Sequence, residues 1–134
     1  MNTLQQHSAF IKKTAAALGF DYCGVAKAVR LDADARRLED WLKKGMQENM
    51  DYMEKYFDLR IDPSKLVPGA RSVITLLQNY FPEQKQADGA PKISKYAYGK
   101  DYHEVIREKL NALIHLIKEN IGEINILRVI TVPK

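Results

Sequence analysis

The segment from Ile93 to His103 carries the densest set of side chains that could do chemistry. Its sequence, ISKYAYGKDYH, holds three tyrosines, two lysines, an aspartate and a histidine around Gly99. Tyrosine offers a flat apolar ring with a hydrogen-bonding tip, which suits a planar cofactor or a base, and lysine suits phosphate or carboxylate groups. A structural interpretation is equally open, in which Asp101 caps a helix, Tyr96 and Tyr102 pack into the core, and the lysines are solvated.

Two single residues extend this list of candidates. His103 could act as an acid, a base or a metal ligand, although a lone histidine in a first helical turn is more often structural. Arg60 lies beside a turn in DLRIDP, where its guanidinium could clamp a phosphate or a carboxylate. Spacing alone favours the plainer alternative for Arg60, which is an ion pair with Asp58 or Asp62, or simple solvation.

Cysteine usage limits the metal chemistry. Cys23 is the only cysteine, so the sequence excludes an intrachain disulfide and a zinc or iron-sulfur site built from its own cysteines. His7 and His115 have no cysteine or carboxylate partners at metal-ligand spacing. No metal site is therefore predicted, and Cys23 is expected to be an inert small hydrophobe in a strand.

Size and composition indicate one soluble domain spanning residues 1–134. The chain is 46% hydrophobic, which is enough for one sizeable core. Its net charge of +4, from 21 basic and 17 acidic side chains, permits an anionic partner without requiring one. Because no apolar run approaches the length of a membrane span and no secretory signal is visible, a cytoplasmic protein without a membrane is expected.

The elements that must position these residues alternate along the chain. Apolar spacing predicts a helix over residues 3–18, ending at Gly19, and a buried strand over 20–28, where Gly24 admits a neighbouring backbone. A second helix is predicted to be capped by Asp32 or Asp34 and to end at Gly45.

The second half of the chain continues the pattern. A short helix is predicted over 50–57, then a turn-rich segment 62–69, a strand over 72–79 and an exposed loop over 82–92. The clearest helix runs from 101 to 122, and a last strand is predicted over 124–132. This alternation indicates an α/β fold, with α+β as the alternative, in which helices cover a mixed sheet.

Taken in order, the segments from residue 10 to residue 121 resemble the N-terminal domain of epoxyqueuosine reductases. The groups from Arg60 to Tyr80 and from Ile93 to His103 are specific, because long spacings between unrelated residue types are rarely matched by chance. The matching residues are Gly19-Phe20, Gly24-Val25-Ala26, Trp41-Leu42, Gly45, Met50, Tyr52-Met53, Arg60, Asp62-Pro63, Leu66, Pro68-Gly69-Ala70, Ser72-Val73-Ile74, Asn79-Tyr80, Ile93-Ser94, Tyr96-Ala97, Gly99 and Asp101-Tyr102-His103.

The resemblance implies a cobalamin-binding reductase that takes electrons from iron-sulfur clusters and converts epoxyqueuosine to queuosine in a tRNA. It also implies a corrinoid-binding domain like that of reductive dehalogenases. The cofactor-binding residues would then be Arg60, Tyr96 and Tyr98. The substrate-binding residues would be Lys95, Asp101, Tyr102 and His103.

The sequence departs from the family pattern in three places. Gln47 and Glu48 replace a histidine and a glycine, and the ending LRVITVPK has no aspartate where the family keeps a catalytic one before a proline. Because that aspartate is absent, the resemblance predicts no catalytic residue here. The cysteines of the family's cluster domain are absent as well.

The departures lead us to expect a truncated N-terminal part of the enzyme, inactive alone, which could self-associate through an unfinished C-terminal edge. Two alternatives stay open: a stand-alone corrinoid- or RNA-binding domain without catalysis, and a folded remnant with no ligand.

Overall fold

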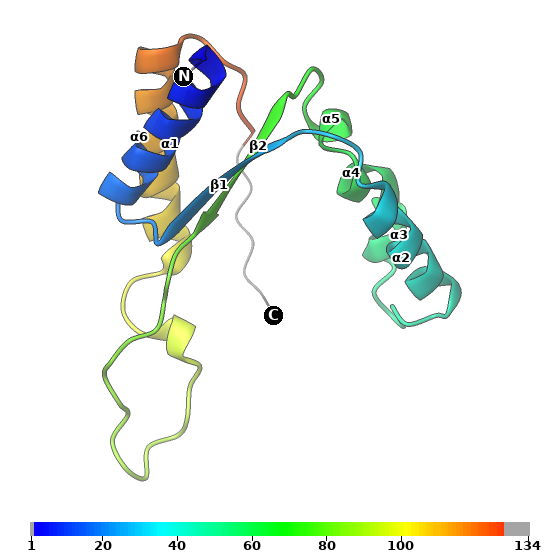
Figure 1. The fold of residues 1–134 in the computed structure, drawn as a ribbon. Helices are drawn as coiled ribbons and strands as arrows, with labels where there is room; N and C mark the ends of the chain where they lie inside the picture. Colours follow the sequence, from blue (N-terminus) through cyan, green and yellow to red (C-terminus); the bar gives the residue numbers. More distant parts are fainter. Residues whose placement is uncertain (1, 128–134) are drawn as a thin grey trace. The chain divides into compact units, whose positions relative to one another are not determined.

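A computed structural model describes residues 2–127 (Figure 1). Contacts divide the chain into two compact units, of which the second comprises Val25–Ile74 and the first comprises the residues before and after it. The division falls inside both strands of the sheet, and the single domain over 1–134 stays a prediction. Among residues 2–127, no helix is both long and apolar enough to cross a membrane.

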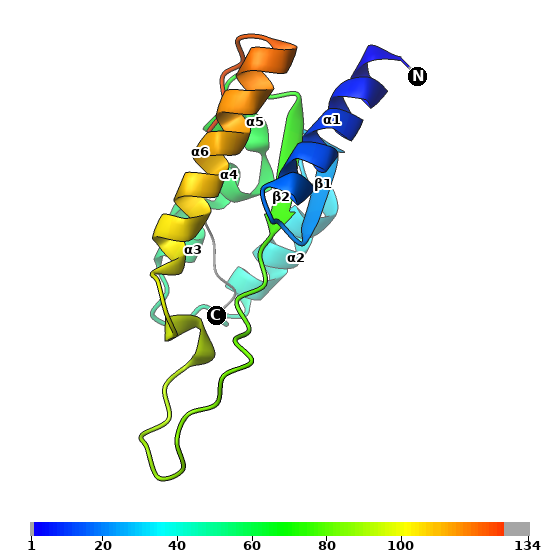
Figure 2. The ribbon, with the colours of Figure 1, turned by 90° about the vertical axis from the view of Figure 1, so that its left-hand side faces the viewer.

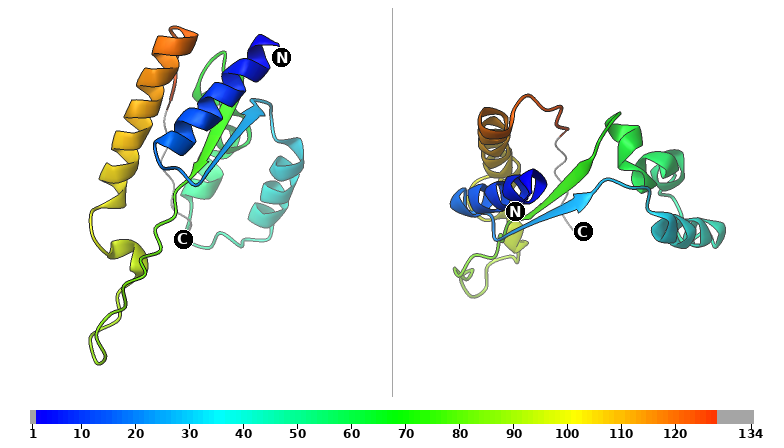
Figure 3. Two further views of the ribbon diagram at one scale, coloured as in Figure 1. Left: turned by 60° about the vertical axis from the view of Figure 1, so that its left-hand side comes forward. Right: turned by 45° about the horizontal axis from the view of Figure 1, so that its top comes forward.

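The first unit is built on two helices, α1 (Thr3–Ala17) and α6 (Tyr102–Ile121). They lie against each other in all views (Figures 1 and 3). The buried residues of each helix are four positions apart, Ile11 and Ala15 on α1 and Leu113 and Ile117 on α6. This spacing places each pair on one helix face, and Phe20 completes this small core.

The ends of α1 and α6 follow the sequence signals. Asn2 and Gln5 form a reciprocal capping box at the start of α1, each side chain accepting the other's backbone N–H at 2.9 and 3.0 Å. Gly19 follows α1 with a φ of 83°, and Gly122 ends α6 with a φ of 122°, conformations that favour glycine. Both predicted helices are therefore confirmed.

The sheet pairs β1 (Tyr22–Lys27) with β2 (Ser72–Leu77). The Asp21 N–H donates to the Leu77 carbonyl at one end, and the Ala28 N–H donates to the Arg71 carbonyl at the other, so the strands are antiparallel. Both predicted strands are confirmed, as is the α/β class. The first strand is not buried as predicted, because its residues are half-buried or exposed.

Two further expectations about the sheet meet different outcomes. A Cβ atom on Gly24 would lie 3.3 Å from the Tyr22 ring. The space for a larger residue at position 24 is therefore restricted by a side chain and not by a neighbouring backbone. The last strand predicted over 124–132 is not found in residues 124–127, and the rest of it lies outside the described residues. The mixed sheet therefore stays a prediction.

The second unit holds one longer helix, α2 (Asp32–Lys43), followed by three short ones: α3 (Tyr52–Lys55), α4 (Phe57–Ile61) and α5 (Pro63–Leu66) (Figure 2). Ala35 of α2 and Ile61 of α4 are its buried apolar residues, and the Leu31 N–H donates to the Ile61 carbonyl at 2.7 Å. α2 and α4 pack together. This unit has a smaller core than the first.

The helix starts in the second unit differ from the expectation. Leu31 occupies the N-cap of α2 and makes no side-chain capping bond, so neither Asp32 nor Asp34 caps the helix. Both lie in its first turn, where their charges favour the positive end of the helix dipole. The helix predicted over 50–57 begins at Tyr52 and breaks at Tyr56 before α4.

Candidate functional site

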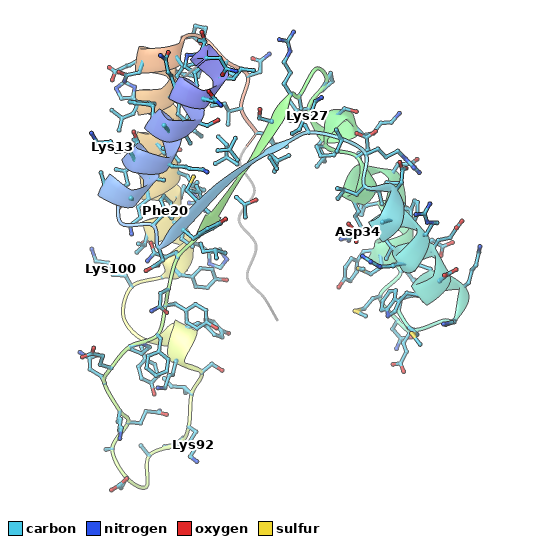
Figure 4. The ribbon with its side chains drawn as sticks, in the orientation of Figure 1. Lys13, Phe20, Lys27, Asp34, Lys92 and Lys100 are labelled. Atoms are coloured by element: carbon cyan, nitrogen blue, oxygen red, sulfur yellow. The ribbon has the colours of Figure 1, made fainter. Side chains whose placement is uncertain are left out.

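The Ile93–His103 segment connects the loop after β2 to the start of α6. Within it, a single 3-10 turn, η1 (Lys95–Ala97), precedes the first two residues of α6, and Figure 4 places Lys92 and Lys100 on the same connection. Asp101 is the N-cap of α6, because its Oδ1 accepts the His103 backbone N–H at 2.9 Å. The capping role predicted for Asp101 is therefore confirmed.

The same Asp101 oxygen also orients the His103 ring. His103 Nδ1 lies 2.9 Å from Asp101 Oδ1, and the His103 ring centroid lies 3.9 Å from that of Tyr102 at a 30° tilt. With the Nδ1 proton donated to the carboxylate, Nε2 is the ring nitrogen available to accept or donate. The arrangement can hold an imidazole in one orientation at a half-exposed position.

The tyrosines of the segment lie at the surface. Tyr96 is 48% exposed and meets Tyr102 edge to face, with centroids 5.9 Å apart and planes at 81°. Tyr102 and Tyr98 are half-buried. The interpretation in which Tyr96 packs into the core is therefore wrong, because this residue is 48% exposed and its ring pairs with Tyr102.

Lys95 contacts Phe81, a residue that no sequence motif above includes. Its Nζ lies 3.6 Å from the centroid of the Phe81 ring, which is 62% exposed. Such a contact is a cation–π interaction, worth about 0.5–1 kcal/mol at exposed sites. The signal in the sequence was the pair of large rings, Tyr80 and Phe81, in the segment that follows the predicted strand, and both residues are exposed.

A shallow hollow lies beside Phe81. It is lined by the residue before β1, the last residue of β2 and the four residues after it: Asp21, Leu77, Gln78, Asn79, Tyr80 and Phe81. The Asn79 N–H donates to the Asp21 carboxylate at 2.6 Å, which holds the two chain segments together there. Exposed apolar side chains and amides thus share one surface in the first unit.

Arg60 belongs to the second unit, on α4. Its guanidinium lies 5.7 Å from the Tyr52 ring centroid and donates to the Tyr52 carbonyl at 3.5 Å. The predicted alternative of an ion pair with Asp58 or Asp62 is not found. The Asp62 carboxylate instead accepts from the Ser64 hydroxyl and backbone, and these bonds lower the pKa of Asp62 below its usual value.

Residues 2–127 contain no cluster of three or more His, Cys, Asp or Glu side chains that could hold a metal ion. Cys23 is half-buried in β1, and this burial raises the pKa of its thiol, with a smaller opposing effect from Lys12. A raised thiol pKa lowers the thiolate fraction at neutral pH and hence the reactivity of Cys23.

We predict that Asp101→Asn flattens the acid dependence of stability. The His103 backbone N–H, and then its ring, lower the pKa of Asp101, so its ionised form stabilises the fold above the unfolded pKa. That stability disappears as the pH falls through the lowered pKa. Melting followed by circular dichroism between about pH 6 and about pH 3 should show a smaller decrease in Tm for the variant. Parallel curves would contradict this role.

Comparisons with known proteins agree on one family. Residues 60–131 match the family model described as Epoxyqueuosine reductase QueG, DUF1730. Epoxyqueuosine reductase of Cyclobacterium marinum is 50% identical over 127 residues, which cover 93% of this chain and 41% of that protein. The enzyme of Cellulophaga algicola is 56% identical over 124 residues, or 92% and 40% of the two chains.

A solved structure gives the same result. Epoxyqueuosine reductase with an epoxyqueuosine-modified tRNA-Tyr stem loop aligns with a TM-score of 0.63 and 26% identity, over 88% of this chain and 32% of that one. The chain thus spans about 40% of the length of the two curated relatives given above.

Proposed function

This chain belongs to the epoxyqueuosine reductase family, and we propose that it forms the N-terminal part of an enzyme that reduces epoxyqueuosine to queuosine in tRNA. The family match over residues 60–131 carries this proposal. The matched range includes Arg60 and the whole Ile93–His103 segment, where the candidate side chains lie.

We propose cobalamin as the cofactor of this part, in a domain like the corrinoid-binding domain of reductive dehalogenases. A corrinoid presents a broad apolar ring with polar groups at its edge, so its site needs apolar surface with a few polar anchors. The residues present suit both needs: the Tyr96 side chain is about half exposed, and the Arg60 guanidinium is held near the Tyr52 ring. Arg60, Tyr96 and Tyr98 are the proposed cofactor-binding residues.

The modified nucleoside is proposed to contact the start of α6 and the turn before it. Single-stranded RNA loops are bound by stacking on aromatic rings and by hydrogen bonds to base edges. The Asp101–His103 pair offers fixed polar atoms, while Tyr102 and Lys95 offer a ring and a cation. These four residues are the proposed substrate-binding set, and the tRNA is the proposed partner in the cytoplasm.

The chemistry beyond binding is proposed to belong to other residues. When bound, cobalamin supplies the electron-transfer chemistry, and the iron-sulfur clusters that reduce it need cysteines besides Cys23. We assign no catalytic residue in this chain. Its own side chains are proposed to bind and orient the cofactor and the nucleoside.

A second candidate function is binding of a corrinoid or RNA without catalysis. The observation that favours it is the exposed surface of Phe81, Tyr96 and Lys95, because aromatic rings interleaved with lysines bind single-stranded nucleic acid irrespective of any reaction. The two functions differ in whether the chain, supplied with cobalamin and an electron donor, reduces an epoxyqueuosine-containing stem loop. Reduction would favour the enzyme, and binding without reduction would favour the second function.

We predict that Arg60→Ala and Tyr96→Ala each weaken cobalamin binding about tenfold, the equivalent of about 1.4 kcal/mol. The measurement is a titration of cob(II)alamin followed by its visible spectrum. Arg37→Ala and Tyr22→Ala are matched controls, since both side chains are exposed and neither is in the proposed sites. Loss of a cooperative melt would instead assign the residue a structural role, and no spectral change with the unsubstituted chain would contradict the cofactor.

A further inference from the structure

The hollow beside Phe81 is an open surface at the end of β2 in the first unit. Three of its lining residues, Leu77, Tyr80 and Phe81, are large, apolar in most of their atoms and exposed. Sites for small planar groups are concave and mostly apolar, with a few polar groups that fix the orientation of the ligand. The lining of this hollow therefore suits a planar ligand that enters from solvent.

Two hydrogen bonds fix the backbone that presents the Phe81 ring. The Phe81 N–H donates to Asn79 Oδ1 at 3.0 Å, which closes an Asx turn. The Asn79 N–H in turn donates to the Asp21 carboxylate at 2.6 Å. A ring on a backbone that is already fixed loses little freedom when a ligand binds, so Phe81 is a preorganised stacking surface.

Charged groups at the hollow suit a nucleotide. An ionised carboxylate accepts several hydrogen bonds, so Asp21 can accept an N–H from a ligand beside the backbone N–H that it already holds. Lys95 Nζ lies 3.6 Å from the Phe81 ring centroid, and Lys109 Nζ donates to Gln78 Oε1 at 2.5 Å. Two ammonium groups thus accompany one carboxylate, and this excess of positive charge favours an anionic ligand.

The η1 turn connects this hollow to the proposed nucleoside contacts. Its first residue, Lys95, faces the Phe81 ring, and its second, Tyr96, meets the Tyr102 ring with centroids 5.9 Å apart. The proposed substrate-binding set at the start of α6 therefore continues through adjacent residues to the hollow. An RNA loop bound at the start of α6 would bring its next nucleotide toward Lys95 and Phe81.

We infer that the Phe81 hollow binds the unpaired base next to the modified nucleoside. The base stacks on the Phe81 ring, the Asp21 carboxylate accepts an N–H from its edge, and Lys95 contacts the phosphate. The inference rests on the proposed function and adds a second base to the tRNA contact. Because every base has a flat face and an N–H on its pairing edge, the hollow selects unpaired nucleotides and not one particular base.

The test is a double-mutant cycle between the protein and the RNA. Phe81→Leu keeps an apolar side chain and removes the ring, and an abasic residue replaces the base on one or the other side of epoxyqueuosine in the stem loop. Fluorescence anisotropy of the labelled stem loop measures each affinity. Phe81→Leu and removal of one flanking base should each weaken binding about tenfold. Together they should also cost about tenfold, because both remove the same contact.

Two further variants serve as controls for this cycle. Tyr56→Leu removes an exposed ring of the second unit and should leave the affinity unchanged. Phe81→Tyr keeps a ring in the hollow and should bind like the unsubstituted chain. Because Phe81 is exposed, circular dichroism melts of both Phe81 variants should match that of the unsubstituted chain.

The outcomes separate this inference from the proposed function. Binding by the unsubstituted chain with additive losses at both flanking positions would overturn the role of the hollow alone. No binding of the stem loop by the unsubstituted chain would overturn both. Equal weakening by Tyr56→Leu would also overturn the inference, as would a change in self-association of Phe81→Leu without a change in RNA affinity, because the hollow would then bind protein.

Discussion

Replacing Leu113 by alanine is expected to lower the free energy of unfolding by about 2–5 kcal/mol. Leu113 is only 3% exposed and lies on the face of α6 that packs against α1. Truncation removes its apolar burial and leaves a cavity in a core with few other members. A domain stabilised by about 5–15 kcal/mol would lose a large share of its stability.

Leu4→Ala is the matched control for this prediction. Leu4 lies on α1 and is 76% exposed, so the same chemical change should alter stability by at most about 0.5 kcal/mol. Urea unfolding followed by circular dichroism measures both variants. Equal effects at the two positions would show that the α1–α6 interface contributes little to the stability of the first unit.

The fold could be predicted from the sequence wherever one local pattern decides it. The 3.6-residue spacing of α6 and the glycine after α1 each specify an element without knowledge of its neighbours. Burial could not be predicted in the same way. The β1 sequence is mostly apolar, yet its exposure depends on which elements cover the sheet, and this is not encoded within six residues.

Helix starts also differ in whether local sequence or a distant contact determines them. Asp101 caps α6 as predicted, because its carboxylate accepts a backbone N–H only two residues further along the chain. Such a short-range bond depends on local sequence alone. At α2 the choice between Asp32 and Asp34 was wrong because Leu31 takes the cap position. There the backbone is held by the bond from Leu31 to Ile61, thirty residues along the chain, which no pattern around Asp32 indicates.

The candidate site was predictable in its composition and not in its contacts. The density of rings and charges in Ile93–His103 marks this segment as a candidate, but the contact of Lys95 with Phe81 depends on the path of a long loop. The contacts of Lys109 could not be predicted for the same reason, because its partners come from two distant parts of the sequence.

Lys109 joins three segments of the first unit through one ammonium group. Its Nζ donates to the Gly19 carbonyl at 3.1 Å and to Gln78 Oε1 at 2.5 Å, and it lies 5.5 Å from the Phe20 ring centroid. The end of α1 and the residue after β2 are thus tied to α6. Because Lys109 lies less than two turns after His103, this connection also fixes where the start of α6 lies.

Lys109→Met is therefore expected to destabilise the chain by about 1.5–3 kcal/mol, the range for hydrogen bonds to a charged group. The methionine keeps much of the apolar stem and leaves the Gly19 carbonyl and Gln78 Oε1 without their donor. A double-mutant cycle with Gln78→Leu isolates the side-chain bond, and an interaction energy of about 0.5–3 kcal/mol is expected for residues in contact. Additive effects would show that the Lys109–Gln78 bond contributes nothing measurable.

The same variant tests whether this connection positions the candidate site. If Lys109 fixes the start of α6, Lys109→Met should weaken binding of an epoxyqueuosine-containing stem loop even under conditions where the chain stays folded. Lys118→Met is the control, because Lys118 lies on the same helix and its ammonium donates to the exposed Glu123 carboxylate at 3.3 Å. Equal binding by the two variants would confine Lys109 to stability, since the proposed nucleoside contacts at Asp101, Tyr102 and His103 would then be independent of how α6 is anchored.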